Sequence, residues 1–201
     1  MKREEVYDQI SSAFEKKYLG LGKEVAEELL LSAAAWNIQE HNKLDYRVRR
    51  HVCLFWPAGW LKSSLLMRFY DILGSDLCVY TSDLTLATLR GSVDNGKFVV
   101  PACLKRPFAV ATEFGQIVNA ESADIVQKLL NVLEEGVVTV NLVKIGQMDD
   151  LSREYAQANY GVKFIDNNTF TYKTNWTLLA GTYNKKYLSD NALESRFNIV
   201  S

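Results

Sequence analysis

The chain has 201 residues, of which 48% are hydrophobic and 23% charged, as is usual for one globular domain. Its net charge of −1 provides no overall attraction to nucleic acid, so any contact with DNA has to come from local basic groups. Two histidines argue against a His-based metal site, and we expect neither a signal peptide nor a membrane span.

The three cysteines are widely spaced and lie in or beside apolar runs: Cys53, Cys78 and Cys103. This placement favours buried hydrophobic side chains in a reducing compartment over a disulfide or a metal set. We therefore expect an intracellular, cytoplasmic protein.

Two helices are predicted before the first strand, over residues 3–16 and from about residue 23 to about residue 39. Val6, Ile10 and Phe14 repeat at i, i+4 in the first helix, and the second carries two adjacent apolar rows. Both patterns indicate packing against the core.

A buried strand over residues 52–55 is followed by the strand-breaking residues 57–59 (PAG), and then by a helix that opens with Lys62 and Ser63. This is the order of parts in a phosphate-binding P-loop. There, the helix N-terminus offers unpaired N–H groups, the lysine ammonium reaches the β- and γ-phosphates, and the hydroxyl binds Mg²⁺.

The match to G-x-x-x-x-G-K-[ST] is incomplete, because Trp56 stands at the first glycine position and Leu61 at the second. On the loop alone, a buried turn with a solvated Lys62 is an equal alternative. Trp56 precedes a proline and is therefore expected in extended backbone, with its ring packed in the core rather than stacked on a base.

Four more buried strands are predicted, at residues 77–80, 108–113, 176–180 and 197–200. The segments between them are expected to contain a helix at 84–89, a hairpin with an Asn95-Gly96 turn at 92–100, a helix at 122–135, and a long hairpin of strands 137–145 and 162–172 with a helical tip at 149–159.

Five buried strands with intervening helices imply an open α/β sheet with helices on both faces. Ligands in such sheets bind at the carboxyl ends of the strands. Lys62, Glu113 and Asn184 all follow such ends, which strengthens the P-loop interpretation.

Taken in order, these segments resemble the AAA+ core of the minichromosome maintenance (MCM) replicative helicases. The resemblance runs from about residue 18 to residue 200. It covers the family's opening segment at 18–35, its P-loop at 58–66, its helix-2-insert hairpin at 84–100, its Walker B run at 108–115, its presensor hairpin at 130–146, its first-sensor strand at 178–184 and its arginine-finger segment at 193–200.

The resemblance implies one AAA+ P-loop ATPase core over residues 1–201, with N-terminal helices in 1–48 and the sheet core in 49–201. It implies a five-stranded parallel sheet between helices, with two β-hairpins and without the family's C-terminal lid. It also implies ATP and Mg²⁺ as cofactors, non-specific binding to single- or double-stranded DNA, and a homo-oligomeric ring such as a hexamer.

Site residues follow from the same resemblance. Nucleotide would be bound by Gly59, Trp60, Leu61, Lys62, Ser63 and Ser64. Glu113 would be the general base, Asn184 would orient the attacking water, and Arg196 would reach the nucleotide of a neighbouring subunit.

Two further pairs complete the expected site. Ser63 and Thr112 would lie at Mg²⁺, with a weakened affinity because Thr112 replaces the Walker B aspartate. Lys144, sharing a strand face with Val138, Val140 and Leu142, would contact DNA phosphates, as would Lys97 on the other hairpin.

Two other functions stay open. The first is a degenerate relative that binds DNA, nucleotide or protein and hydrolyses ATP weakly or not at all, which Thr112 and Trp56 favour. The second is a MoxR-type chaperone or activator ATPase that acts on proteins.

Overall fold

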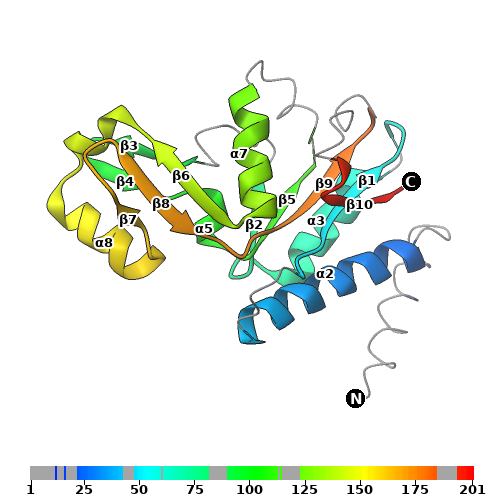
Figure 1. Cartoon of the computed structure of the whole chain (residues 1–201). Coiled ribbons are helices and arrows are strands. Elements are labelled where there is room, and N and C mark those ends of the chain that lie inside the picture. The colour runs from blue at the N-terminus through cyan, green and yellow to red at the C-terminus, as the bar shows by residue number, and fades with distance from the viewer. Residues whose placement is uncertain are drawn as a thin grey trace.

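The computed structural model describes residues 12, 16, 22–42, 48–59, 61–81, 90–112, 114, 123–184 and 194–201. Its centre is a five-stranded sheet in which all neighbouring strands are parallel (Figure 1). The strand order is β10 (Phe197–Val200), β1 (His51–Phe55), β9 (Thr177–Thr182), β5 (Phe108–Ala111) and β2 (Cys78–Thr81). The predicted α/β class and all five strands are confirmed.

Alternating side chains of the strands divide the interior into two cores, one on each face of the sheet. Val52 and Leu54 of β1 pack toward helices α2 (Gly22–Asn42) and α3 (Lys62–Leu73). Cys53 points to the opposite core, with helix α7 (Ala123–Glu134). Because successive strand residues face opposite sides, a strand buried on both faces reads as one continuous apolar run.

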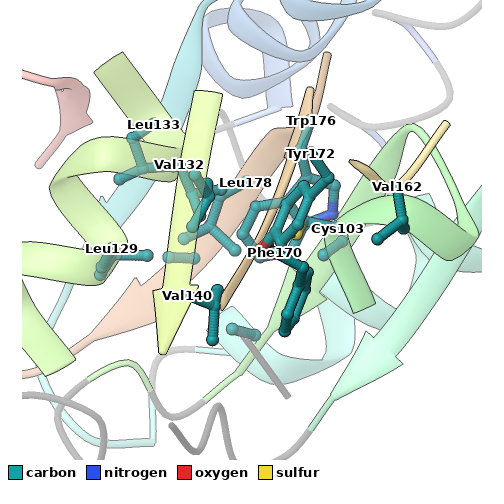
Figure 2. Packing of buried hydrophobic residues seen from close by; sticks show 14 of the residues in the cluster. Cys103, Leu129, Val132, Leu133, Val140, Val162, Phe170, Tyr172, Trp176 and Leu178 are labelled. Carbon is teal, nitrogen blue, oxygen red and sulfur yellow. Dashed lines mark hydrogen bonds between the residues drawn. The ribbon is translucent and has the colours of Figure 1, made fainter. Parts of the chain in front are cut away.

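The core on the α7 side continues into a lobe, defined here as residues 92–99 and 137–173, that projects from the sheet (Figure 1). The lobe contains a three-stranded antiparallel sheet in the order β6 (Val137–Asn141), β8 (Thr169–Lys173) and β7 (Lys163–Phe164). Helix α8 (Asp150–Tyr160) forms its tip. Figure 2 shows Phe170, Tyr172 and Trp176 packed together with residues of α7, so the lobe shares its core with the sheet.

A second hairpin, β3 (Ser92–Asp94) and β4 (Lys97–Val99), packs on this lobe. Its turn residues Asn95 and Gly96 have φ values of 48° and 78°, as a tight turn with two left-handed positions requires. The Gly96 carbonyl accepts from the Asp149 N–H at 2.9 Å, and the Phe98 N–H donates to Ser152 Oγ at 2.9 Å. Both predicted hairpins are therefore present, and they contact each other.

The predicted strand 137–145 is too long, and the expected position of Lys144 is wrong. The ladder between β6 and β8 ends at the Asn141–Thr169 pair, so the chain has no strand partner beyond that point. It turns instead into a 3₁₀ helix, Val143–Gln147, in which Ile145 is buried and Lys144 is exposed. Lys144 consequently does not continue the apolar face of β6.

The predicted helices can be compared with the observed ones. The predicted helices 23–39 and 122–135 correspond to α2 and α7, and the helix predicted to open at Lys62 is α3. A short helix, α5 (Ala102–Lys105), was not predicted. The predicted helix at 84–89 and nearly all of 3–16 lie outside the described residues. All three cysteines are buried, as expected, and none of them forms a disulfide within the described part of the chain.

Candidate functional site

The order of the sheet brings three segments together at its carboxyl edge. Strands β1, β9 and β5 are immediate neighbours, and each ends at this edge because all are parallel. The predicted P-loop follows β1, Tyr183 and Asn184 follow β9, and Thr112 follows β5. The Trp56 N–H extends the β1–β9 pairing through a bond to the Thr182 carbonyl at 3.2 Å.

The predicted P-loop has positive φ values, which favour glycine, at two positions. Gly59 has φ 85°, and Leu61 has φ 59° and ψ 12°, the left-handed conformation. Leu61 precedes α3, makes no side-chain cap, and leaves its side chain 55% exposed. A bulky residue in this conformation is strained and gains little from burial here, so the loop geometry, and not packing of the side chain, holds Leu61 in place.

Lys62 folds back under its own loop. Its Nζ donates to the carbonyl oxygens of Trp56 at 2.7 Å and Pro57 at 2.8 Å, and the residue is only 9% exposed. The alternative of a solvated lysine is therefore wrong. A buried ammonium needs such partners, because removing it from water without them is costly. These bonds tie the beginning of the loop to the first turn of α3.

A hollow of about 370 Å³ lies against this loop. Its lining consists of Ala58, Gly59, Leu61, Lys62, Ser63, Ser64 and Tyr183. The structure thus groups five of the six predicted nucleotide-binding residues, whereas Trp60 lies outside the described residues. Tyr183, 52% exposed, was not predicted, although its position directly after β9 places it at the same edge.

Gly181 in β9 shows how closely the P-loop helix and the end of β5 approach each other. A methyl group on its backbone would lie 3.2 Å from the Thr112 carbonyl oxygen, 3.8 Å from Lys62 Cβ and 3.0 Å from Leu66 Cδ1. The absence of a side chain therefore lets Leu66, Lys62 and the Thr112 carbonyl all approach this strand position closely.

The Thr112 hydroxyl is already engaged. Thr112 is 5% exposed, and its Oγ1 lies 3.4 Å from the hydroxyl of Tyr80 on β2. The Tyr80 ring packs edge-on against Tyr70 of α3, with centroids 5.9 Å apart. Tyr80, like Tyr183, was not predicted at the site. Its contact with Thr112 exists only because β2 pairs with β5.

Asn184 and Arg196 lie at opposite edges of the sheet, and neither lines the hollow. The Asn184 N–H donates to Thr182 Oγ1 at 3.3 Å, which fixes the turn after β9, but Asn184 does not line the hollow. Arg196 precedes β10 and therefore lies at the opposite, amino-terminal edge of the sheet. There it forms an ion pair with Glu134 at 2.6 Å, so it cannot act on a ligand at the P-loop of its own chain.

Of the remaining predicted residues, Glu113 lies outside the described part of the chain. Trp56 is 3% exposed and belongs to the core beside α2 and α3, which confirms its predicted packing. Lys97 and Lys144 are exposed on the lobe, apart from the P-loop hollow.

The site residues suit phosphate better than a bare metal ion. The α3 N-terminus and Lys62 supply positive charge, and Ser63 supplies an exposed hydroxyl. Within the described ranges, no group of three or more His, Cys, Asp or Glu side chains is arranged to hold a metal. Mg²⁺ fits this site only in the way it usually binds with nucleotides, through phosphate oxygens and few protein ligands.

Burial also makes the cysteines poor nucleophiles, since it raises the pKa of Cys53, Cys78 and Cys103 to about 12. None of the helices in the described part of the chain is both long enough and apolar enough to cross a membrane.

The fold and the site define an α/β protein whose five-stranded parallel sheet is flanked by helices and is compatible with a P-loop-like core. Compared with models of known protein families the sequence matches none, and a comparison with curated proteins also gives no match.

Proposed function

We propose that this chain is an MCM-like AAA+ ATPase domain that binds ATP with Mg²⁺ and acts on DNA as part of an oligomeric ring. The observation that carries the proposal is the buried Lys62 at the start of α3, beside a hollow at the carboxyl edge where β1, β9 and β5 end together. Ligands of open parallel sheets bind at this edge.

Lys62 and the first N–H groups of α3 would hold the β- and γ-phosphates, with the hydroxyl of Ser63 directed to the cation. Bound Mg²⁺ would neutralise charge that develops on the phosphate oxygens. Thr112 adds a neutral hydroxyl instead of a carboxylate, so the protein contributes less charge to that task. Glu113 would accept the proton of the attacking water.

Arg196 is proposed to act between subunits. Its distance from its own P-loop, across the length of the sheet, suits a residue that completes the site of a neighbour. To do so it must exchange the Glu134 carboxylate for a phosphate. Lys144 and Lys97 are exposed on the lobe, where cations can contact DNA phosphates without reading sequence.

One specific observation favours the degenerate alternative, in which nucleotide is bound and scarcely hydrolysed. Leu61 stands where a P-loop has a glycine with a free backbone, and Thr112 stands where it has a carboxylate that faces the metal ion. The Thr112 hydroxyl is also paired with Tyr80. The MoxR-type chaperone or activator alternative makes the same use of ATP and differs in acting on proteins.

The deciding experiment measures ATP binding by the purified chain and its ATP turnover with and without DNA. The parent should bind ATP and turn it over faster with DNA, whereas Lys62→Ala should lose at least about tenfold in affinity, because a charge-assisted phosphate contact is worth more than 1.4 kcal/mol. Lys163→Ala, which removes an exposed lysine from β7, is the matched control.

Each result selects one function. Equal ATP affinity in Lys62→Ala and the parent would contradict the P-loop assignment. Binding without turnover would favour the degenerate relative, and turnover indifferent to DNA would favour the protein-directed ATPase.

A further inference from the structure

A second hollow, of about 470 Å³, lies at the amino-terminal edge of the sheet, away from the P-loop. Its walls come from α2, from α5 and the residues leading into β5, and from the chain between β8 and β9. These segments meet at the junction between the lobe and the central sheet, and Figure 1 shows α5 at that junction.

The lining of this hollow carries three cations and no acidic residue. Lys105, Arg106 and Lys173 are all exposed. Within the described part of the chain, none of them forms an ion pair with a carboxylate. Arg106 is fixed by bonds from its Nε to the Ser75 carbonyl at 2.7 Å and from its Nη1 to the Lys105 carbonyl at 2.8 Å.

Two side-chain contacts connect the segments that carry these cations. Thr174 Oγ1 donates to the Cys103 carbonyl at 2.6 Å, and Cys103 Sγ lies 3.4 Å from the Tyr172 hydroxyl. These contacts join α5 to the end of β8, so Lys105 and Lys173 extend from two elements that are held together. Like charges that line one hollow repel each other, and a bound polyanion relieves that repulsion.

An aromatic ring completes the hollow. Trp36 of α2 packs against the buried Phe108, with centroids 5.4 Å apart, and also lines the hollow. The contact with Phe108 anchors the indole, so little conformational freedom is lost when another planar group stacks on it. Cations beside a fixed aromatic ring are the combination that binds single-stranded nucleic acids, with phosphates on the charges and a base on the ring.

We propose that this hollow binds single-stranded nucleic acid, with Lys105, Arg106 and Lys173 contacting phosphodiesters and Trp36 stacking on a base. The proposal deepens the DNA-binding part of the proposed function, but it does not require a nucleotide at Lys62. It adds a contact at the junction of the lobe and the sheet to those expected from Lys144 and Lys97 farther out on the lobe.

The test uses the full chain without ATP and a fluorescently labelled oligothymidylate of about 20 nucleotides, enough for one protein site. Fluorescence anisotropy over a salt series should give binding that weakens with salt. The Lys105→Gln/Lys173→Gln variant should bind at least tenfold more weakly at low salt, and its salt slope should be smaller by about 1.4, the value for two lost phosphate contacts. The matched control, Lys163→Gln, should bind like the parent.

A second variant tests stacking separately. Trp36→Leu should weaken binding by roughly fivefold or more, as loss of one base–aromatic contact does, and should abolish part of the tryptophan fluorescence quenching caused by the oligonucleotide. Circular dichroism and the thermal midpoint report whether the fold is kept. The exposed Lys105 and Lys173 variants provide the test even if Trp36→Leu unfolds.

The proposal is overturned if the parent does not bind the oligonucleotide, or if the Lys105/Lys173 variant binds like the parent at every salt concentration. It is also overturned if thymidine monophosphate competes as well as the oligonucleotide at equal nucleotide concentration, because the hollow would then be a simple phosphate site. A Lys97→Ala/Lys144→Ala variant separates the two proposals. If only the Lys97/Lys144 variant loses binding, the proposed site in the hollow is overturned. If only the Lys105/Lys173 variant loses binding, the site in the hollow is supported and the proposed DNA contact of Lys97 and Lys144 is contradicted.

Discussion

At the scale of single residues, Leu61 is the position where the chain is most strained for its sequence. Its φ of 59° suits glycine, and its side chain is 55% exposed. We expect Leu61→Gly to raise the free energy of unfolding by about 0.5–1 kcal/mol, because relief of a left-handed conformation exceeds the added chain entropy of glycine. Urea denaturation measures this change.

The matched control for Leu61→Gly is Arg68→Gly, at an exposed position of α3 with helical backbone. There glycine should lower the free energy of unfolding by about 0.5–1 kcal/mol. If both substitutions destabilise the chain equally, the left-handed conformation at Leu61 is not costly.

A second residue-scale prediction concerns Thr112, whose hydroxyl lies 3.4 Å from that of Tyr80. Thr112→Asp should make ATP binding more strongly dependent on Mg²⁺, because it places a negative charge beside the expected cation, with the Tyr80 hydroxyl available to donate to it. Titration calorimetry with ATP at several Mg²⁺ concentrations measures this. Thr112→Asn, which has a similar size and no charge, should not reproduce the effect, and an identical response from both variants would remove Thr112 from the metal site.

Sequence reasoning located Lys62, Ser63 and Gly59 because their order along the chain is itself the signal. It missed Tyr183, Tyr80 and Gly181, whose relation to the P-loop exists only once β9 is inserted between β1 and β5. Contacts that depend on non-sequential strand pairing have no local pattern from which to predict them.

At the scale of elements, apolar runs predicted all five strands of the central sheet. The inner strands β5 and β9 are buried at every position, and the edge strands β2 and β10 are partly exposed but still bury Cys78, Phe197 and Val200. The predicted strand at 137–145 is too long because the sequence pattern does not show where the partner strand begins. Alternation continues past Asn141 in the sequence, but the partner strand β8 begins only at Thr169, so the ladder ends there. Strand length is set by the partner, which a single segment does not reveal.

His51 joins two of these elements and should make stability depend on pH. Its Nε2–H donates to the Leu133 carbonyl of α7 at 3.1 Å, and its Nδ1 accepts from the Leu178 N–H of β9 at 3.1 Å. This arrangement requires the neutral ring. Burial, aided by the charge of Arg49, lowers the pKa of His51 from 6.5 to about 4.

The sign of the pH effect follows from that lowered pKa. Between about pH 6.5 and pH 4 the unfolded chain binds a proton that the folded chain excludes, so stability is complete above pH 6.5 and falls as the pH drops toward 4. The loss should approach about 3 kcal/mol, as the size of the shift implies. Urea denaturation at several pH values measures it, and in His51→Gln this part of the pH dependence should disappear. An unchanged profile in His51→Gln would assign the effect to carboxylates.

At the scale of the whole molecule, the sheet separates the two halves of the proposed shared ATPase site. The predicted P-loop lies at the carboxyl edge, and Arg196 lies at the amino edge in an ion pair with Glu134. One chain therefore cannot bring both to the same nucleotide, and the proposed activity depends on assembly. Turnover per chain should rise with protein concentration, since a monomer lacks the arginine contribution.

Mixing two inactive variants tests this arrangement directly. Lys62→Ala lacks a working P-loop but keeps Arg196, whereas Arg196→Ala keeps the P-loop. Each alone should lose most ATP turnover, the second by about 10³-fold or more if Arg196 acts as arginine fingers do. Their equimolar mixture should recover part of the activity, because interfaces that pair an intact P-loop with an intact Arg196 form again. Glu134→Gln, which releases Arg196 from its ion pair, should retain turnover and provides the control for damage at that edge. If the mixture stays inactive while gel filtration shows mixed oligomers, Arg196 does not act on a neighbouring site and belongs to the ion pair with Glu134 alone.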